Sequence, residues 1–294
     1  MVDGHVAKAP RSRPRRSRQL ARRIALDGLS LYWHGTGRLE AGLTRPRVHF
    51  VYLHSLPSEH EARFDAWVEE LVRTYVPLSY SAAVDRVLRG PIDQPFVALS
   101  LDDGFRSCAR VGDLLARRGI SACFFVPTGF VGTPTVDQAR HFFGAAAGVD
   151  EPAMTWGDIE ALKAAGHEVG SHTARHIDLS NASTTQINQE IGESLSVLQS
   201  RLGVCEHFAW PLGTFDHFSP AAAQAVTRVG LASCASAVRG AHTVSSTDRS
   251  SLCIRRDHVP AEWPHRHGRY FLARSSLRSS GSDNCWPTPW IGAM

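Results

Sequence analysis

The chain has 294 residues, of which 43% are hydrophobic and 20% charged, a balance that is ordinary for a globular protein of one large domain or two small ones. No stretch approaches the roughly 18 apolar residues of a membrane-spanning helix, so we expect none. The net charge of +4 is unevenly spread. Residues 1–23 hold seven Arg and one Lys against one Asp, a net charge of +7, which leaves −3 for residues 24–294.

The Arg-rich segment 1–23 contains prolines and no hydrophobic stripe, so it is expected to be a solvated, disordered tail. Its charge leaves contact with anionic surfaces open, while no specific nucleic-acid partner is predicted. The segment also lacks the apolar stretch of a signal peptide. The six cysteines have no C-x-x-C spacing, which predicts buried, reduced thiols and a cytoplasmic protein. The oligomeric state is left open.

Short apolar runs alternate with helical patterns between residues 47 and 259. Strands are expected where β-branched and aromatic residues cluster, and helices where apolar residues recur every three or four positions. Thr155 is the expected N-cap of one helix. The predicted strands are 47–55, 96–101, 121–131, 167–173, 207–213, 231–236 and 252–259, and the predicted helices are 59–75, 106–119, 155–166 and 183–203.

Strands that alternate with helices pair in parallel, so the predicted fold is α/β, with either a barrel or a doubly wound sheet. We divide the chain into a tail with a lead-in helix (1–46), a main domain (47–260) and a C-terminal extension (261–294). The extension lacks hydrophobic periodicity. It is therefore expected to be irregular, with its tryptophans packed on the main domain.

Four side chains of catalytic type stand at predicted strand ends, where active sites of such folds collect: His54, Asp102, Asp103 and His172. Two adjacent carboxylates after a buried strand repel each other unless a cation offsets their charge. His176 follows His172 by four residues, so both imidazoles are expected to point the same way. Two histidines and one carboxylate can hold a divalent metal and leave positions open. The spacing alone is also compatible with a chance surface pair.

The motifs in combination resemble the polysaccharide deacetylase family, which is carbohydrate esterase family 4, with the nodulation-factor deacetylase homology domain. "FVYLHSLP" (50–57) is similar to the opening strand of that family, and "VALSLDDGF" (97–105) to its first motif. "HTARH" (172–176) resembles its second motif and "FAWPLGTFD" (208–216) its third. The resemblance covers residues 47–259 and implies a distorted, incomplete (β/α) barrel of about seven strands.

The resemblance also implies roles for these residues. Asp103, His172 and His176 would bind one divalent metal, zinc by default, with cobalt, nickel or iron fitting the same ligands. Asp102 would be the general base, accepting a proton from the water that the metal activates. The backbone N–H of Leu212 would help to stabilise the oxyanion of the tetrahedral intermediate.

The sequence departs from the family at three places, one of which is the fourth motif, an Asp-rich segment ending in Trp, which is not visible. Ala209 stands where the third motif often has an arginine that orients the base, and Arg255 or Arg256 could replace it. The histidine that acts as general acid has no clean match, and His258 is the nearest candidate. An ordinary salt bridge at a strand end explains the segment around His258 equally well.

Three residues are expected to contact substrate: His54, Trp210 and Arg256. His54 stands at the end of the first strand, where an ordinary strand-terminal histidine is the alternative. Trp210 could stack on a sugar ring, with packing in the core as its alternative.

The predicted function is a metal-dependent hydrolase that removes an N-acetyl or N-formyl group from an amino sugar. The substrate would be a polysaccharide, an oligosaccharide or a glycolipid precursor. The alternative is a catalytically impaired relative that only binds carbohydrate, because the arginine and the general acid are not found in their usual motifs. Retention of Asp102 argues against it, since binding alone needs no base.

Overall fold

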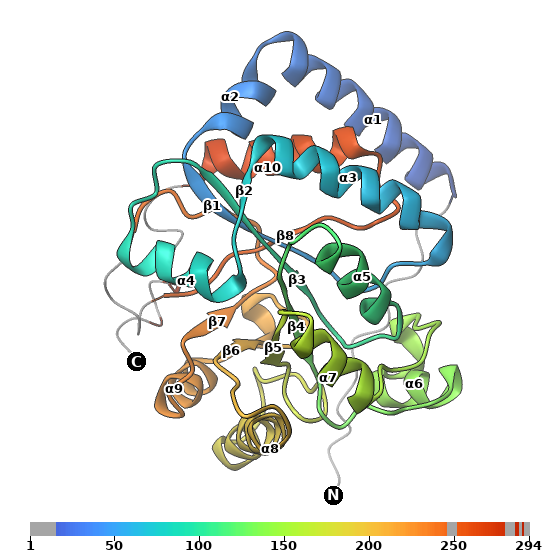
Figure 1. The fold of residues 1–294 in the computed structure, drawn as a ribbon, viewed down its shortest axis with the longest axis vertical. Coiled ribbons are helices and arrows are strands. Elements are labelled where there is room, and N and C mark those ends of the chain that lie inside the picture. The colour runs from blue at the N-terminus through green and yellow to red at the C-terminus, as the bar shows by residue number, and fades with distance from the viewer. Residues whose placement is uncertain (1–15, 246–251, 280–285, 288–289, 291–294) are drawn as a thin grey trace, which may run out of the picture.

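The strands form one curled parallel sheet (Figure 1). The computed structural model describes residues 16–245, 252–279, 286–287 and 290. The strands are β1 (Arg47–Leu53), β2 (Val76–Pro77), β3 (Pro95–Leu101), β4 (Ala122–Val126), β5 (Glu168–Ser171), β6 (His207–Ala209), β7 (Ser233–Ala235) and β8 (Asp257–His258). Their order is β7-β6-β5-β4-β3-β1-β8, with β2 beside β3. This arrangement confirms the α/β class and the distorted, incomplete barrel.

A short irregular segment joins the two ends of the sheet. β8 pairs with β1, and a few residues earlier Ile254 forms a parallel bridge with Ala235 of β7. The N–H of Ile254 donates to the carbonyl of Cys234 at 2.9 Å, and the N–H of Ser236 donates to the carbonyl of Ile254 at 2.8 Å. Residues 254–258 therefore cross the gap between the first and last strands.

Side chains along each strand alternate between the inside of the barrel and the surrounding helices. In β3, Phe96 and Ala98 belong to the inner hydrophobic cluster, whereas Val97 and Leu99 belong to the outer one. The same alternation, continued past the strand end, places Asp102 on the inner side. The period of the strand thus determines which polar residues face the lumen.

Helices cover the outside of the sheet, and one helix closes the inside. The apolar face of α4 joins the inner cluster. The helices of this part are α3 (Glu61–Thr74), α4 (Tyr80–Arg89), α5 (Ser107–Ala116), α6 (Val136–Phe143), α7 (Trp156–Ala164), α8 (Thr184–Leu202) and α9 (Pro220–Arg228), with 3-10 turns η1 (Ser58–His60), η2 (Ala145–Ala147) and η3 (Phe215–His217). α3, α5, α7 and α8 confirm the predicted helices, and Thr155 caps α7 in a capping box with Asp158. α4, α6, α9 and β2 were not predicted.

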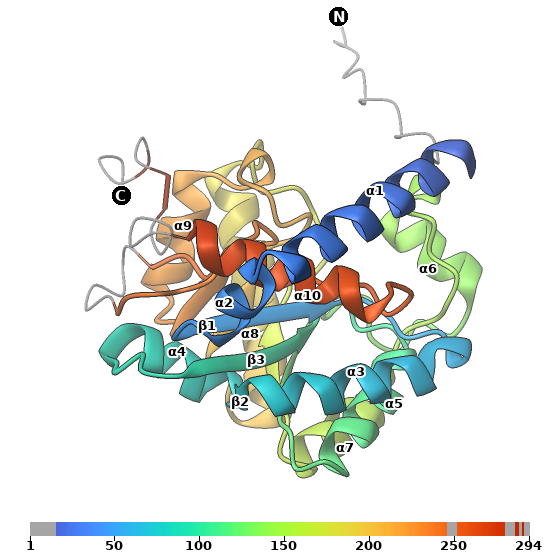
Figure 2. The same ribbon diagram turned by 90° about the horizontal axis from the view of Figure 1, so that it is seen from above.

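The C-terminal extension was expected to be irregular, and this expectation was wrong for α10 (His265–Arg278). α10 packs between α1 (Arg16–Gly35) and α2 (Arg38–Thr44), on the side of the barrel that carries β1 (Figures 1 and 2). Its buried face includes Gly268, Ala273, Ser275 and Ser276. Small and hydroxylated residues give no hydrophobic period, so the sequence pattern hides this helix.

The N-terminal tail was also expected to extend to residue 23, but α1 begins at Arg16. The expected packing of C-terminal tryptophans is confirmed for Trp286, which is buried and stacks on Phe218 with ring centroids 5.7 Å apart. Five cysteines are buried and free, as predicted, and Cys285 lies outside the described residues. Among the described helices, none combines the length and apolar character needed to cross a bilayer.

We expect Gly42→Ala to destabilise the protein by about 1–3 kcal/mol, the usual cost of overpacking a tight contact. A Cβ at Gly42 of α2 would lie 2.7 Å from the Cβ and the carbonyl oxygen of Ala273 in α10. Gly28→Ala in α1 is the control, because its Cβ would meet open space and alanine favours a helix. Urea denaturation measures both, and equal stability of the two variants would contradict the close α2–α10 contact.

Candidate metal centre and active site

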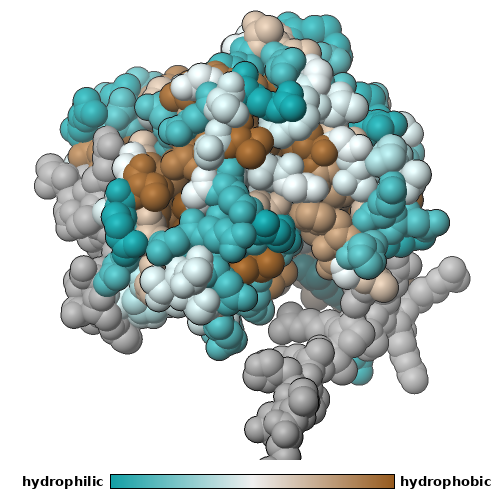
Figure 3. Space-filling model, turned by 90° about the horizontal axis from the view of Figure 1, so that it is seen from below, coloured by the Kyte–Doolittle hydropathy of each residue, from teal (hydrophilic) through white to brown (hydrophobic). Residues whose placement is uncertain are grey.

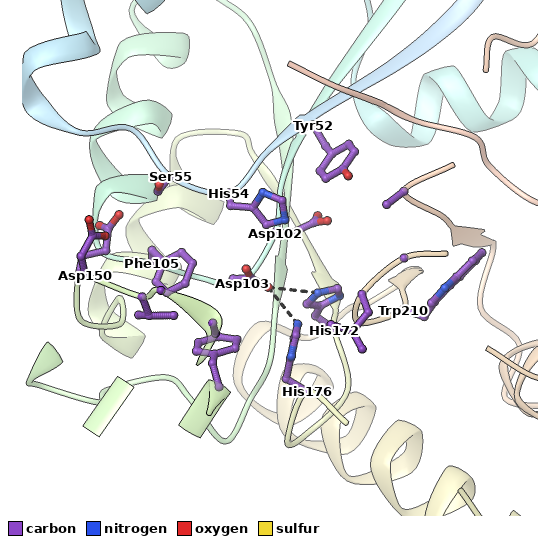
Figure 4. A pocket seen from close by; sticks show the side chains of 18 residues that line it. Tyr52, His54, Ser55, Asp102, Asp103, Phe105, Asp150, His172, His176 and Trp210 are labelled. Carbon is purple, nitrogen blue, oxygen red and sulfur yellow. Dashed lines mark ion pairs between the residues drawn. The ribbon is translucent and has the colours of Figure 1, made fainter. Parts of the chain in front are cut away.

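Asp102 and Asp103 follow β3 directly, yet they meet different partners (Figure 4). The N–H of Asp102 donates to the carbonyl of Leu53 at 3.0 Å, which extends the strand pairing by one residue. Asp103 has φ 73°, in the left-handed region, so the chain turns at this residue. The turn separates the two adjacent carboxylates and gives each its own environment.

Asp103, His172 and His176 form a cluster whose three ligand atoms lie within 4.8 Å of one another. Oδ1 of Asp103 lies 3.4 Å from Nε2 of His172 and 3.2 Å from Nε2 of His176 (dashed in Figure 4). Burial disfavours the charge of Asp103, but the hydrogen bonds with the two histidines outweigh it and hold the pKa of Asp103 well below its usual value. The carboxylate is therefore ionised at neutral pH. The structure brings together the three predicted metal ligands.

The tautomer of His172 shows that this cluster suits a cation. Nδ1 of His172 lies 2.7 Å from the carbonyl oxygen of Ala209, and a carbonyl only accepts, so Nδ1 carries the hydrogen. Nε2 can then donate to the carboxylate of Asp103 only when the ring is protonated on both nitrogens, whereas in the neutral ring it presents a lone pair toward this carboxylate. Two acceptors that face each other in a buried site are stabilised by a metal ion between them. The donor set of two imidazoles and one carboxylate fits a zinc-type site.

The loop that carries the histidines is held by α8. Thr173 and His176 both have positive φ, at 64° and 55°, so the segment is a strained turn and not the start of a helix. Oε2 of Glu190, a buried residue of α8, accepts hydrogen bonds from the N–H groups of Ala174 at 3.1 Å and Arg175 at 2.8 Å. Sequence reasoning missed Glu190. The feature of the sequence that could have indicated Glu190 is an acidic residue on the apolar face of the predicted helix 183–203.

Asp102 is paired with Arg256, which comes from the segment that closes the barrel. Both residues are buried, and the guanidinium contacts both carboxylate oxygens at 2.8 Å. Burial opposes the charge of Asp102, but Arg256 and then His172 lower the pKa of Asp102 below its usual value. The same pairing outweighs burial and raises the pKa of Arg256. Of the two arginines expected to replace the one that is missing at Ala209, the structure brings Arg256 into contact with Asp102.

Arg256 was also expected to contact substrate, and its burial contradicts this. Its side chain is 0% exposed, its Nε donates to the carbonyl of Ser236 at 2.7 Å, and its guanidinium lies over the ring of Tyr52 at 4.5 Å. All three guanidinium nitrogens thus form hydrogen bonds inside the barrel. Arg255 lies instead over Phe215, at 5.1 Å.

His54 and His258 lie side by side, at different depths. His54 lines the pocket, next to Asp102 (Figure 4). His258 is stacked on Tyr52 with ring centroids 4.9 Å apart and meets the ring of His54 at 5.0 Å, but it does not belong to the pocket lining. Burial, together with the positive charge of neighbouring residues, lowers the pKa of His258 to about 3. His258 is therefore neutral at physiological pH, whereas the expected place of His54 at the pocket is confirmed.

Trp210 and Leu212 follow β6, where the third motif was predicted. The Trp210 side chain is fully buried and stacks on Phe218 at 4.4 Å, and its indole N–H donates to the carbonyl of Thr214 at 3.1 Å. Trp210 is one of the residues that line the pocket, although its side chain packs in the core, and its stacking on a sugar stays a prediction. Leu212 has φ 62° and lines the pocket. Within the described residues, its N–H has no hydrogen-bond acceptor.

One pocket of about 620 Å³ is lined by the candidate metal ligands together with His54, Asp102, Trp210 and Leu212. Its walls also contain residues that the sequence did not single out: Tyr52, Ser55, Phe105, Phe143, Asp150 and Glu151. Burial raises the pKa of Tyr52 to about 12, so its hydroxyl stays protonated. None of the described lining residues is Lys or Arg. The pocket therefore offers carboxylates, imidazoles and aromatic edges, but no cation that would attract a phosphorylated or carboxylated ligand.

The fold and this site define the class of the protein: a (β/α)-barrel protein with a candidate divalent-metal centre at the carboxyl ends of its strands. Residues 89–232 match the family model of polysaccharide deacetylase. The chain carries a polysaccharide deacetylase domain, as its motifs predicted. The match includes Asp102 and all three candidate ligands, whereas His54 and Arg256 lie outside it.

Solved structures of deacetylases share the fold. IcaB from Ammonifex degensii superposes with a TM-score of 0.64 at 20% identity, over 79% of this chain and 97% of that one. Deacetylase PplD from Streptococcus pyogenes, in complex with acetate, has a TM-score of 0.60 at 18% identity, over 77% and 98%. The BpsB deacetylase domain from Bordetella bronchiseptica has a TM-score of 0.55 at 20% identity, over 74% and 97%. No curated protein sequence matches this chain.

Proposed function

We propose that this protein is a metal-dependent carbohydrate deacylase that hydrolyses the N-acetyl or N-formyl amide of an amino sugar. The observation that carries the proposal is the presence of two differently partnered carboxylates in one pocket. Asp103 faces two histidines, and Asp102 faces a buried arginine. An uncharged saccharide suits a pocket whose described lining has no Lys or Arg. The deacetylase names of proteins with this fold support the same reaction.

Asp103, His172 and His176 would hold the ion, which we propose to be zinc. When bound, a divalent cation polarises the amide carbonyl and makes water more acidic. The chain supplies the rest of the chemistry. Asp102 accepts a proton from the attacking water, and the Arg256 fork keeps the carboxylate ionised and in one orientation. The N–H of Leu212 donates to the oxyanion that forms at the carbonyl.

The last step breaks the carbon–nitrogen bond and needs a proton on the leaving amine. His258 was the candidate from the sequence, but it lies behind His54 and outside the pocket lining. We therefore propose that His54 delivers this proton and that His258 positions the ring of His54. The products are then the free amino sugar and the carboxylate of the released acyl group.

His54→Phe is expected to lower kcat by about a hundredfold or more, because a general acid contributes that much. His258→Phe keeps a ring against Tyr52 and is expected to lower kcat by less than about tenfold. Steady-state kinetics on an N-acetylated oligosaccharide compares the two matched variants. A larger loss in His258→Phe would return the role of general acid to His258.

The proposed function is tested with protein loaded with Zn²⁺, Co²⁺, Ni²⁺ or Fe²⁺ in separate preparations. Release of acetate from N-acetylated chitooligosaccharides, or of formate from N-formyl amino sugars, is expected in at least one of them. Asp102→Asn is the control, because it keeps the ligand set and removes the base. Saccharide binding without acyl release in every preparation would favour the carbohydrate-binding alternative. Full activity after complete metal removal would contradict the metal-dependent mechanism.

A further inference from the structure

Helix α1 exposes a row of large apolar side chains that nothing in the described chain covers. Leu20, Ile24 and Leu31 are 60%, 62% and 68% exposed, and their spacing of four and seven residues places them on one face of the helix. We call these three residues the apolar stripe. α1 runs across α10 at the surface, and its N-terminal half extends beyond the barrel (Figure 2). Single exposed apolar residues are common, but an aligned row on one helix indicates a contact surface.

A second feature lies on another face of α1, in the groove between α1 and the start of α10. This pocket has a volume of about 550 Å³. Its lining includes Arg22, Arg23, Arg63 and Arg266, together with the half-buried Trp263. We call it the basic groove. Arg22 lies over the ring of Trp263 at 5.7 Å.

Most of the charge in the basic groove is uncompensated. Arg266 pairs with Asp27 at 2.7 Å, and Glu262 also lines the groove. In the described part of the chain, Arg22, Arg23 and Arg63 form no ion pair. The basic run of the sequence continues through residues 1–15 with three further Arg and one Lys. The groove therefore lies within the most positive part of a chain whose remainder is acidic.

We propose that the apolar stripe and the basic groove together bind the surface of an anionic lipid bilayer. A helix with exposed Leu and Ile on one face and Arg on its other faces lies in the plane of the interface, with the long arginine side chains reaching the head groups. The apolar stripe would enter the boundary between head groups and acyl chains. Arg18 and the arginines of the groove would contact lipid phosphates, and Trp263 has the amphipathic ring that favours this depth.

Charge and exposure favour lipid over the two other occupants. A nucleic acid would use the arginines but would leave Leu20, Ile24 and Leu31 in water. A second copy of the chain would bring two uncompensated arginine clusters together, which repel. An anionic bilayer would bury the apolar stripe among acyl chains and pair the arginines of the basic groove with lipid phosphates. On the opposite side of the molecule, hydrophobic residues form several groups separated by hydrophilic ones (Figure 3).

The full-length protein is mixed with sucrose-loaded vesicles of phosphatidylcholine and phosphatidylglycerol in equal amounts and sedimented. We expect binding to these vesicles, weak or no binding to pure phosphatidylcholine, and a loss of binding at high salt. The stripe variant Leu20→Gln/Ile24→Gln/Leu31→Gln is expected to bind at least about tenfold more weakly. The groove variant Arg22→Gln/Arg23→Gln is expected to lose about fivefold for each arginine.

Val204→Gln/Val229→Gln is the matched control, because it also removes exposed apolar side chains, 47% and 42% exposed, but from other elements. Glutamine favours a helix, and circular dichroism checks that each variant is folded. The proposal is overturned if the unaltered protein ignores anionic vesicles or if the stripe variant binds them equally well. Tighter binding to duplex DNA than to vesicles, unaffected by the stripe variant, would identify a polyanion site instead. A dimer that the stripe variant dissociates would identify a second copy as the occupant.

Discussion

Replacing Asp103 by alanine is expected to lower kcat/KM by about a thousandfold or more and to abolish the binding of divalent metal. Asp103 is the single carboxylate of a cluster whose other members are two imidazoles, so its loss removes the only anionic ligand of the cluster. The Lewis acidity of a bound ion contributes several kcal/mol to such a reaction, which corresponds to about this factor in rate. Metal content by mass spectrometry and initial rates on the same preparation measure both effects.

Asp150→Ala is the control for this substitution. Asp150 lines the same pocket but lies outside the metal cluster, so the control removes an equal charge without removing a ligand. It is expected to retain its metal. If Asp103→Ala bound metal as tightly as Asp150→Ala, the three-residue centre would be wrong.

The second large effect is expected for Arg256→Met, which should destabilise the protein by about 3–5 kcal/mol and inactivate it. The substitution removes the charged partner of Asp102. The carboxylate stays buried, because the side chains of Arg256 and Asp102 are only 0% and 4% exposed. Burial then raises the pKa of Asp102, so the base becomes protonated and loses its fixed orientation. Arg255→Met is the matched neighbour, and it should cost less than Arg256→Met, because Arg255 is half-buried whereas the Arg256 side chain is fully buried.

The pH dependence of stability distinguishes loss of this ion pair from a simple packing defect. In the unaltered protein, Arg256 holds the pKa of Asp102 below its unfolded value. The contribution of Asp102 is thus complete above the unfolded pKa of about 3.9 and is lost as the pH falls through the folded pKa. In Arg256→Met the sign reverses, because a raised pKa makes stability fall as the pH rises above about 4.

Urea denaturation at a series of pH values measures this difference. The stability of Arg256→Met relative to the unaltered protein should decrease from acidic to neutral pH. A constant difference at all pH values would show that the loss came from packing alone. The double variant Asp102→Asn/Arg256→Met should remove the pH dependence of the pair, because no buried carboxyl remains.

The sequence alone determined the α/β alternation and the placement of Asp102, Asp103 and His172 at strand ends, because these depend on local periods, whereas the roles of these residues were expected from the resemblance of the motifs to polysaccharide deacetylases. Two-residue alternation in the strand 96–101 and the turn after it place Asp102 and Asp103 at the carboxyl end of a buried strand. His172 and His176 lie in one loop for the same reason. Their grouping with Asp103 was expected from the resemblance of the motifs, and the structure brings the three residues together because β3, β4 and β5 are neighbouring parallel strands that end at one edge.

Only the tertiary structure decided which distant residues complete the site. Arg256 reaches Asp102 because residues 254–258 cross between β7 and β1, and this closure has no signature in the local sequence. The depth of His54 relative to His258 and the burial of Trp210 likewise depend on packing around the lumen. α10 was hidden because its buried face mixes Tyr270 and Leu272 with small and polar residues, which gives no clear hydrophobic period, and it packs against α1 and α2. Local hydrophobic periodicity specifies the helices and strands and the polar residues that follow each strand. Contacts between residues far apart in the chain depend on how the sheet curls and on the segment 254–258 that bridges its two ends.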